Sequence, residues 1–199
     1  MKVEKLISKL RETEKISLIP EKSSAVIIPL IEISGEVNVV FTVRSKSLRF
    51  QPGEVCFPGG RIEKGESALE AALRELKEEL LISEGVHILC SLAPMFGPTG
   101  AAVYPFVALL HEYDMTYSPS EVDQVFTYPL SYFKDHPPVR YPMQKRTFAP
   151  DNFPYRKVTD GADTYEWHIQ KYDMWIYEDT YPVIWGFTGR LLHEFLEML

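Results

Sequence analysis

One segment in the first half of the chain constrains its structure most: a glycine-containing loop that leads into a strongly predicted helix. The helix is expected from Ser67 to about Leu80. Ser67 and Glu70 fit a capping box, in which the serine hydroxyl accepts from the third helical amide and the glutamate accepts from the serine amide. Gly60 and Gly65, in the loop, permit backbone conformations that other residues resist. We therefore predict a tight loop packed against the start of a helix.

Three glutamates are concentrated in the last turns of this predicted helix. Glu75 shares a helix face with Glu78 and Glu79, three and four residues later. Clustered like charges on a helix cost roughly 0.2–0.5 kcal/mol per pair, so folding alone does not favour them. A hard divalent cation with oxygen ligands would reverse the sign of that energy. Taken alone, such a cluster is more commonly a solvated acidic face, and a metal site is the alternative.

The loop and the helix together resemble the Nudix box, G-x5-E-x7-R-E-U-x-E-E-x-G-U, in which U is an aliphatic residue. The matching residues are Gly60, Glu66, Arg74, Glu75, Glu78 and Glu79, with Leu76 and Ile82 at aliphatic positions. One position departs, because Leu81 stands where the box has glycine. A leucine in a left-handed cap would cost on the order of 1–2 kcal/mol. We therefore expect the helix to continue to about Gly85.

The resemblance implies an enzyme that hydrolyses phosphoanhydride bonds with the help of a metal. It implies that Glu75, Glu78 and Glu79 bind Mg²⁺ or Mn²⁺. Bound cations would neutralise and align a diphosphate and would acidify a water molecule. Glu66 and Arg74 are the other charged members of the box, and we expect them to serve catalysis by fixing the loop and orienting Glu75.

The general base is a separate question. Glu75 is one candidate, but metal coordination would lower its basicity. The resemblance also points to a glutamate from a later loop, and Glu121 in the stretch 119–122 is the candidate there. A surface carboxylate without a catalytic role is an equally open interpretation of Glu121.

A second stretch, just upstream, resembles the signature of the coenzyme A pyrophosphatases within the Nudix family. That signature is T-x-R-[SA]-x3-R-x3-G-x3-F-P-G-G after two aliphatic residues. The matching residues are Thr42, Arg44, Ser45, Arg49, Gly53, Phe57, Pro58, Gly59 and Gly60, with Phe41 in place of one aliphatic. Residues 184–188 resemble a C-terminal segment of the same enzymes, and 189–190 depart from it. The resemblance implies cleavage of coenzyme A at its pyrophosphate, giving 3′,5′-ADP and 4′-phosphopantetheine.

Coenzyme A carries a 3′-phosphate besides its diphosphate, and guanidinium groups are natural partners of phosphate oxygens. The candidate substrate-binding residues are therefore Arg44, Arg49, Gly59 and Gly60. For both arginines the alternative is an ion pair with a loop carboxylate such as Glu54. A Nudix hydrolase for NADH, ADP-sugars or capped nucleotides is the second functional hypothesis. A non-catalytic nucleotide-sensing module is the third, although such modules usually lose box glutamates that this chain keeps.

The composition of the chain disfavours nucleic acid and membranes as binding partners. The formal net charge of −7 disfavours bulk nucleic-acid binding, because domains that bind nucleic acid are more often basic. No apolar run approaches membrane-spanning length, and neither a signal peptide nor a peroxisomal address is evident. We expect a cytoplasmic protein with a nucleotide substrate of the coenzyme A class and without nucleic-acid or membrane partners; the family suggests a homodimer. Cys56 and Cys90 lie in apolar runs and are expected to be reduced, core-filling thiols.

The rest of the chain predicts a single Nudix hydrolase domain over residues 1–199. Strands are expected at residues 24–33, 37–43, 55–57, 86–92, 103–110 and 165–169, and further helices at 2–10 and 185–199. Residues 1–22 would form an N-terminal extension, and 184–199 would close the fold. Strands and helices do not alternate regularly, which favours an α+β arrangement with a mixed sheet. The resemblance implies a Nudix-like α/β/α sandwich with a catalytic loop–helix–loop motif.

Overall fold

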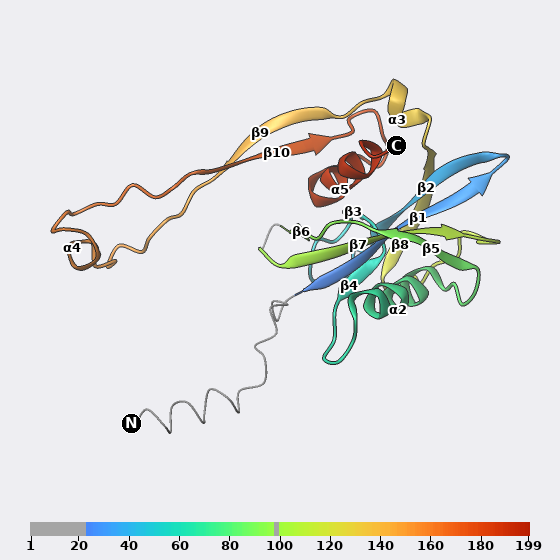
Figure 1. Ribbon diagram of the computed structural model, residues 1–199, viewed down its shortest axis with the longest axis horizontal. Coiled ribbons are helices and arrows are strands. Elements are labelled where there is room, and N and C mark those ends of the chain that lie inside the picture. Colours follow the sequence, from blue (N-terminus) through green and yellow to red (C-terminus); the bar gives the residue numbers. More distant parts are fainter. Residues whose placement is uncertain (1–22, 98–99) are drawn as a thin grey trace. The chain divides into compact units, whose positions relative to one another are not determined.

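The computed structural model describes residues 23–97 and 100–199 (Figure 1). The helix expected at residues 2–10 lies outside this range. The chain divides into two compact units, one ending at Pro129 and the other beginning at Leu130. The single domain over residues 1–199 stays a prediction.

The first unit is built on a mixed β-sheet, as predicted. In the described part of the chain its eight strands are β1 (Ser24–Ile33), β2 (Glu36–Arg44), β3 (Val55–Cys56), β4 (Gly59–Arg61), β5 (Val86–Ser91), β6 (Met95–Phe96), β7 (Ala102–Leu110) and β8 (Val122–Pro129). β1 pairs antiparallel with β2 and parallel with β7. β2 also pairs with β3 and β8, β1 with β4, and β7 with β5 and β6. The short strands β4 and β6, and β8, were not predicted.

The helix α2 (Ala68–Leu80) covers one face of this sheet (Figure 1). Its apolar side chains Leu76 and Leu80 are fully buried in a core cluster that includes Ile27 of β1. Burying a side chain of this size contributes about 1.5–3 kcal/mol, so the sheet and α2 hold each other in place. This packing fixes the acidic side of α2 relative to the loops at the sheet edge.

The start of α2 is as predicted, and its predicted end is wrong. Ser67 is the N-cap, and the capping box with Glu70 is complete. The helix does not continue to Gly85, because Leu81 adopts the left-handed conformation with φ 56°. Leu81 is 58% exposed, whereas Ile82 is only 8% exposed and joins the core. Burial of Ile82 therefore offsets the strain at Leu81.

The second unit consists of a long β-ribbon and short helices. The ribbon pairs β9 (Val139–Lys145) with β10 (Gln170–Ile176), and the helices are α3 (Tyr132–Asp135), α4 (Tyr155–Val158) and α5 (Gly186–Leu196). The closing helix was predicted, and it is α5. The strand predicted at 165–169 is wrong, because Tyr165 and Trp167 instead form edge-to-face contacts in an aromatic cluster with Phe153.

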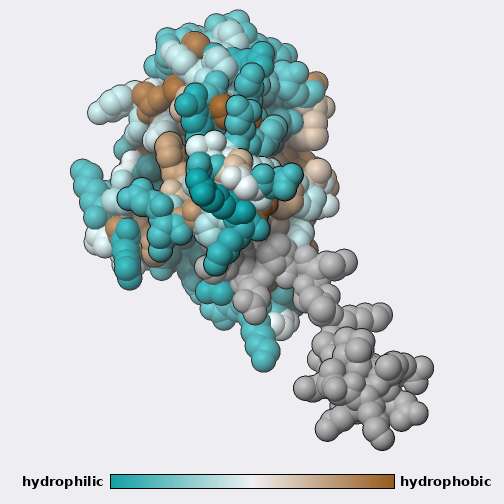
Figure 2. Space-filling model, turned by 90° about the vertical axis from the view of Figure 1, so that its left-hand side faces the viewer, coloured by the Kyte–Doolittle hydropathy of each residue, from teal (hydrophilic) through white to brown (hydrophobic). Residues whose placement is uncertain are grey.

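Both cysteines are free, and Cys90 contradicts the expected core position. It is exposed on β5, where the pairing with β7 shifts register between Ile88 and Cys90. Cys56 is half-buried, and burial raises the pKa of its thiol to about 11. Figure 2 shows a face on which hydrophilic residues predominate and hydrophobic ones form separate patches. None of the helices in the described residues is both long and apolar enough to cross a membrane.

Candidate active site

Three carboxylates from two distant segments meet beside α2. Glu75 and Glu79 lie on the helix, and Glu121 lies immediately before β8; one oxygen of each falls within 4.8 Å of the others. Sequence spacing alone could place the two helical residues together, whereas Glu121 was one of two open candidates for the base. Glu78 is outside this cluster, with a half-exposed carboxylate that accepts from Arg74 at 3.2 Å. Its expected role as a metal ligand stays a prediction.

The strand β4 provides space for two of these carboxylates. A Cβ atom on Gly60 would lie 2.3 Å from Oε1 of Glu75, so a side chain there would displace this carboxylate. At Gly59, with φ +156°, a Cβ atom would lie 2.3 Å from the carbonyl oxygen of Ala25, which would disrupt the pairing of β4 with β1. The backbone of Gly59 also hydrogen-bonds the carboxylate of Glu79. The two glycines thus allow close approach of backbone and carboxylates.

Arg74 connects the loop to the helix. Its guanidinium donates to Glu66 at 2.9 Å, to Glu75 at 2.8 Å and to the carbonyl oxygen of Arg61 at 3.1 Å. These hydrogen bonds hold the pKa of Glu66 below its usual value and raise that of Arg74. Arg74 thereby orients Glu75 toward the cluster. This geometry is the one that the positioning role expected of Arg74 requires.

The buried carboxylate of Glu79 is electrostatically unfavourable without a cation. Its residue is 4% exposed, and among the described residues its Oε2 atom has no hydrogen-bond partner. Burial raises its pKa to about 8; Arg44 opposes the shift, while Glu75 and Glu121 add to it. Burial also raises the pKa of Glu75, against the effect of Arg74. A divalent ion would satisfy the orphaned oxygen and offset two of the three negative charges of the ionised cluster, so these residues fit a metal site.

This arrangement predicts that the metal-free protein loses stability as pH rises. The carboxyl group of Glu79 ionises near pH 4.5 when unfolded and near pH 8 when folded. Between these values only the unfolded state is ionised, so stability falls with pH across that window and changes no further above it. The loss is on the order of 3–5 kcal/mol. We expect chemical denaturation with a chelator present to show this slope in the wild type and a much smaller one in Glu79→Gln. Equal slopes would contradict the prediction.

The loop that carries Glu121 is fastened to the end of α2. The hydroxyl of Thr116 donates to the carbonyl oxygen of Leu80 at 2.8 Å, and the amide of Ser118 donates to that of Glu79 at 2.8 Å. The carbonyl oxygen of Glu121 accepts from the amide of Ser45 at 2.9 Å. These bonds cap helix carbonyls that would otherwise lack partners and place Glu121 against the helix. Thr116 and Ser118 were not predicted from the sequence, where their only signal is a cluster of hydroxyl residues in a loop.

The two candidate substrate arginines have different surroundings. Arg44 donates to the carbonyl oxygen of Phe50 at 3.2 Å, and its charge lowers the pKa of Glu79 against the effect of burial. Arg49 lies over the Phe50 ring at 5.6 Å. Neither arginine forms the alternative ion pair with Glu54 within the described residues. Arg44 is therefore close enough to act electrostatically on the acidic cluster, and Arg49 is on an exposed loop.

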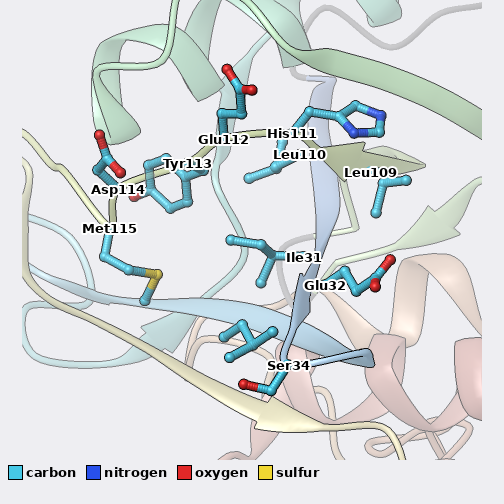
Figure 3. A pocket seen from close by; sticks show the side chains of 11 residues that line it. Ile31, Glu32, Ser34, Leu109, Leu110, His111, Glu112, Tyr113, Asp114 and Met115 are labelled. Carbon is cyan, nitrogen blue, oxygen red and sulfur yellow. The ribbon is translucent and has the colours of Figure 1, made fainter.

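A separate open cavity of about 570 Å³ lies at the C-terminal ends of β1 and β7. It is lined by residues 31–34 and 109–115 (Figure 3). Apolar side chains such as Ile31, Leu110 and Met115 mix there with carboxylates such as Glu32 and Glu112. None of the three clustered glutamates lines this cavity, so it is separate from the acidic cluster formed by α2 and Glu121.

Residues 21–147 match the family model of the NUDIX domain. The chain belongs to the Nudix family. It is accordingly a Nudix pyrophosphohydrolase for nucleotide-type small molecules, in a family that generally depends on divalent metals, and the predicted fold class is confirmed.

Relatives with recorded activities are similar over most of the chain. The peroxisomal coenzyme A diphosphatase of Mus musculus is 34% identical over 166 residues, which covers 78% of this chain and 70% of that protein. A peroxisomal coenzyme A diphosphatase of Caenorhabditis elegans is 32% identical over 177 residues, covering 86% and 66%. A crystal structure of a C. elegans Ap4A hydrolase binary complex is 23% identical, with a TM-score of 0.48, and covers 56% of this chain and 83% of that chain.

Proposed function

We propose that this Nudix hydrolase cleaves the pyrophosphate bond of coenzyme A or a derivative, giving 3′,5′-ADP and 4′-phosphopantetheine or its acyl form. The observation that carries the proposal is the contact of the coenzyme A signature with the acidic cluster. The amide of its Ser45 donates to the carbonyl oxygen of Glu121 at 2.9 Å, and its Gly60 lies so close to Glu75 that a side chain there would displace the carboxylate. The segment that resembles the coenzyme A enzymes thus adjoins the Nudix glutamates, and two relatives bear the name coenzyme A diphosphatase.

The glutamates of the site are proposed to have two roles, metal binding and proton transfer. Glu75 and Glu79 would hold the divalent ion, Mg²⁺ or Mn²⁺, and Glu78 would be a further ligand from the helix. When bound, the ion offsets the charge of the diphosphate and acidifies a water molecule. Glu121 would accept the proton of the water whose oxygen bonds to phosphorus as the P–O–P bond breaks, because its carboxylate lies in the cluster and is less buried than that of Glu79.

Arg44, Arg49 and the backbone at Gly59 and Gly60 are proposed to bind the substrate. Charge-assisted hydrogen bonds from guanidinium groups suit both the diphosphate and the 3′-phosphate. The overall charge of −7 repels an anionic substrate, so local cations must counteract it. The arginines and the bound metal would do so at the site.

A chromatographic assay tests the proposal directly. The full chain is incubated with coenzyme A and Mg²⁺, and we expect equimolar 3′,5′-ADP and 4′-phosphopantetheine. NADH, an ADP-sugar and a capped dinucleotide are assayed in parallel, and coenzyme A should have the highest kcat/KM. A higher kcat/KM for one of the others would favour the second hypothesis, and binding without any product would favour the nucleotide sensor.

Thr116→Val is expected to lower kcat for coenzyme A about tenfold, because it removes the hydroxyl that fastens the Glu121 loop to Leu80 while keeping the side-chain shape. Displacing the Glu121 carboxylate weakens stabilisation of the transition state, and each 1.36 kcal/mol lost there lowers kcat by a factor of ten. Titration with Mn²⁺ should show weaker binding, KM should change little, and Thr116→Ser should restore both kcat and Mn²⁺ affinity.

The matched control is Thr159→Val in the second unit. The hydroxyl of Thr159 donates to the carbonyl oxygen of Tyr155 at 2.8 Å, so the variant loses the same kind of hydrogen bond in a unit that does not contain the Glu121 loop. Its kcat should equal that of the wild type. If Thr116→Val lowers only the melting temperature and leaves kcat and Mn²⁺ affinity intact, the positioning role of Thr116 is wrong.

A further inference from the structure

Phe50 is an aromatic side chain that the fold leaves in solvent beside the candidate active site. The residue is 71% exposed, and such a ring gains little from folding, because hydrophobic stabilisation scales with the apolar area removed from water. The carbonyl oxygen of Phe50 accepts from Nε of Arg44 at 3.2 Å, and the charge of Arg44 acts on Glu79 in the acidic cluster. The exposed ring is therefore fastened to an arginine of the site.

The loop between β2 and β3, which carries Phe50, is held at its base and against the neighbouring loop. The amide of Arg44 donates to the carbonyl oxygen of Glu54 at 3.0 Å, which closes the loop. The amide of Ser45 donates to the carbonyl oxygen of Glu121 at 2.9 Å, which joins the loop to the segment that completes the acidic cluster. A loop that is ordered before a ligand arrives loses less entropy on binding.

One face of the Phe50 ring is covered by a cation. The guanidinium carbon of Arg49 lies 5.6 Å from the ring centroid, and such a cation–π contact restrains the orientation of the ring. The large exposed fraction of Phe50 leaves the other face of the ring open to solvent. Proteins commonly hold nucleobases by stacking them on aromatic side chains, because every base has a π-face. The open face of Phe50 therefore suits a base.

The charges of the same loop suit a phosphorylated nucleoside. Lys46 and Arg49 are exposed on the loop, in a chain whose net charge is −7. In adenosine 3′-phosphate one ribose carries both the base and the phosphate, so the groups that recognise them must lie close together. The guanidinium of Arg49 and the ring of Phe50 meet this requirement, since they are in contact.

We propose that Phe50 stacks on the adenine base of the substrate, while Arg49 binds the 3′-phosphate of the same nucleoside. The inference rests on the proposed function, and it adds a specificity-determining residue at a position that the coenzyme A signature leaves unspecified. The base is not part of the bond that breaks, so stacking stabilises the bound substrate and the transition state equally. The ring therefore acts on KM and not on kcat.

Binding of 3′,5′-ADP to the full chain, measured by isothermal titration calorimetry with Mg²⁺ present, tests the inference without turnover. This compound carries the adenine and the 3′-phosphate but has no diphosphate bond to cleave. Phe50→Leu keeps an apolar side chain and removes the aromatic face, and we expect it to raise the dissociation constant about tenfold. Phe50→Tyr, which keeps that face, should stay within about twofold of the wild type. In steady-state kinetics Phe50→Leu should raise KM for coenzyme A and leave kcat unchanged.

Two controls separate stacking on the base from other effects. Phe148→Leu is the matched variant, because Phe148 is 88% exposed in the second unit, and its dissociation constant for 3′,5′-ADP should equal that of the wild type. The second control is 4′-phosphopantetheine, which lacks the base and should bind Phe50→Leu as it binds the wild type. Circular dichroism and thermal unfolding establish that each variant is folded.

The inference and the proposed function fail in different ways. A wild-type chain that does not bind 3′,5′-ADP overturns the inference, and so does a Phe50→Leu variant with the wild-type dissociation constant, even if the chain cleaves coenzyme A. An effect of Phe50→Leu on 4′-phosphopantetheine alone also overturns it, because the ring would then lie against the other half of the substrate. A chain that binds 3′,5′-ADP through Phe50 but does not cleave coenzyme A supports the stacking site and refutes the proposed function.

Discussion

Glu79→Gln is expected to lower kcat/KM for coenzyme A by about 10²- to 10³-fold at limiting Mg²⁺. The substitution keeps the shape of the side chain and removes the charge of the most buried carboxylate in the site. Metal ions contribute several kcal/mol of transition-state stabilisation, and each 1.36 kcal/mol is a factor of ten. Steady-state kinetics at a series of Mg²⁺ concentrations measures the loss, and excess Mg²⁺ should recover part of it.

Glu78→Gln provides the comparison on the same helix. Glu78 is half-exposed and paired with Arg74, so it reaches an ion only by leaving that pair. We expect a smaller loss than for Glu79→Gln. A loss as large as that of Glu79→Gln would show that Glu78 contributes equally to metal binding, and a wild-type rate for Glu79→Gln would refute the proposed metal site itself.

The metal-free Glu79→Gln protein should be more stable than the wild type above pH 5, because function requires a charge that the fold alone does not favour.

Arg49→Ala is expected to reduce kcat/KM for coenzyme A roughly ten- to hundred-fold more than for dephospho-coenzyme A. The two substrates differ only at the 3′-phosphate, and a charge-assisted hydrogen bond is worth about 1.5–3 kcal/mol. Arg49 is exposed, and its guanidinium lies over the Phe50 ring, so the proposal assigns the 3′-phosphate to this residue. Parallel kinetics on the two substrates measures the difference.

Arg44→Ala serves as the contrast. Arg44 hydrogen-bonds the backbone at Phe50 and acts electrostatically on Glu79. Its loss should therefore lower kcat/KM for coenzyme A and for dephospho-coenzyme A in the same proportion. If Arg49→Ala also affects both equally, the basis of selectivity for coenzyme A lies in other residues. A selective effect of Arg44→Ala alone would assign the 3′-phosphate to Arg44 instead.

The sequence by itself predicted the features that depend on residues close together in the chain. The capping box at Ser67 and Glu70, the pairing of Glu75 with Glu79 on one helix face, and the apolar strands β1, β2 and β7 all follow from local spacing. Helix caps and hydrophobic periodicity act within a few residues, so pattern alone could identify them. The motif spanning Gly60 to Glu79 indicated the family for the same reason.

The tertiary structure decided what depends on contacts between distant segments. Glu121 joins the acidic cluster because Thr116, Ser118 and Ser45 fasten its loop to α2 and β2. Burial of Ile82 in the core outweighed the local cost that argued against a helix end at Leu81. The ribbon likewise pairs residues 139–145 with 170–176, and neither segment was predicted as a strand. Such long-range burial and hydrogen bonding exist only once the chain is folded, and sequence spacing does not encode them.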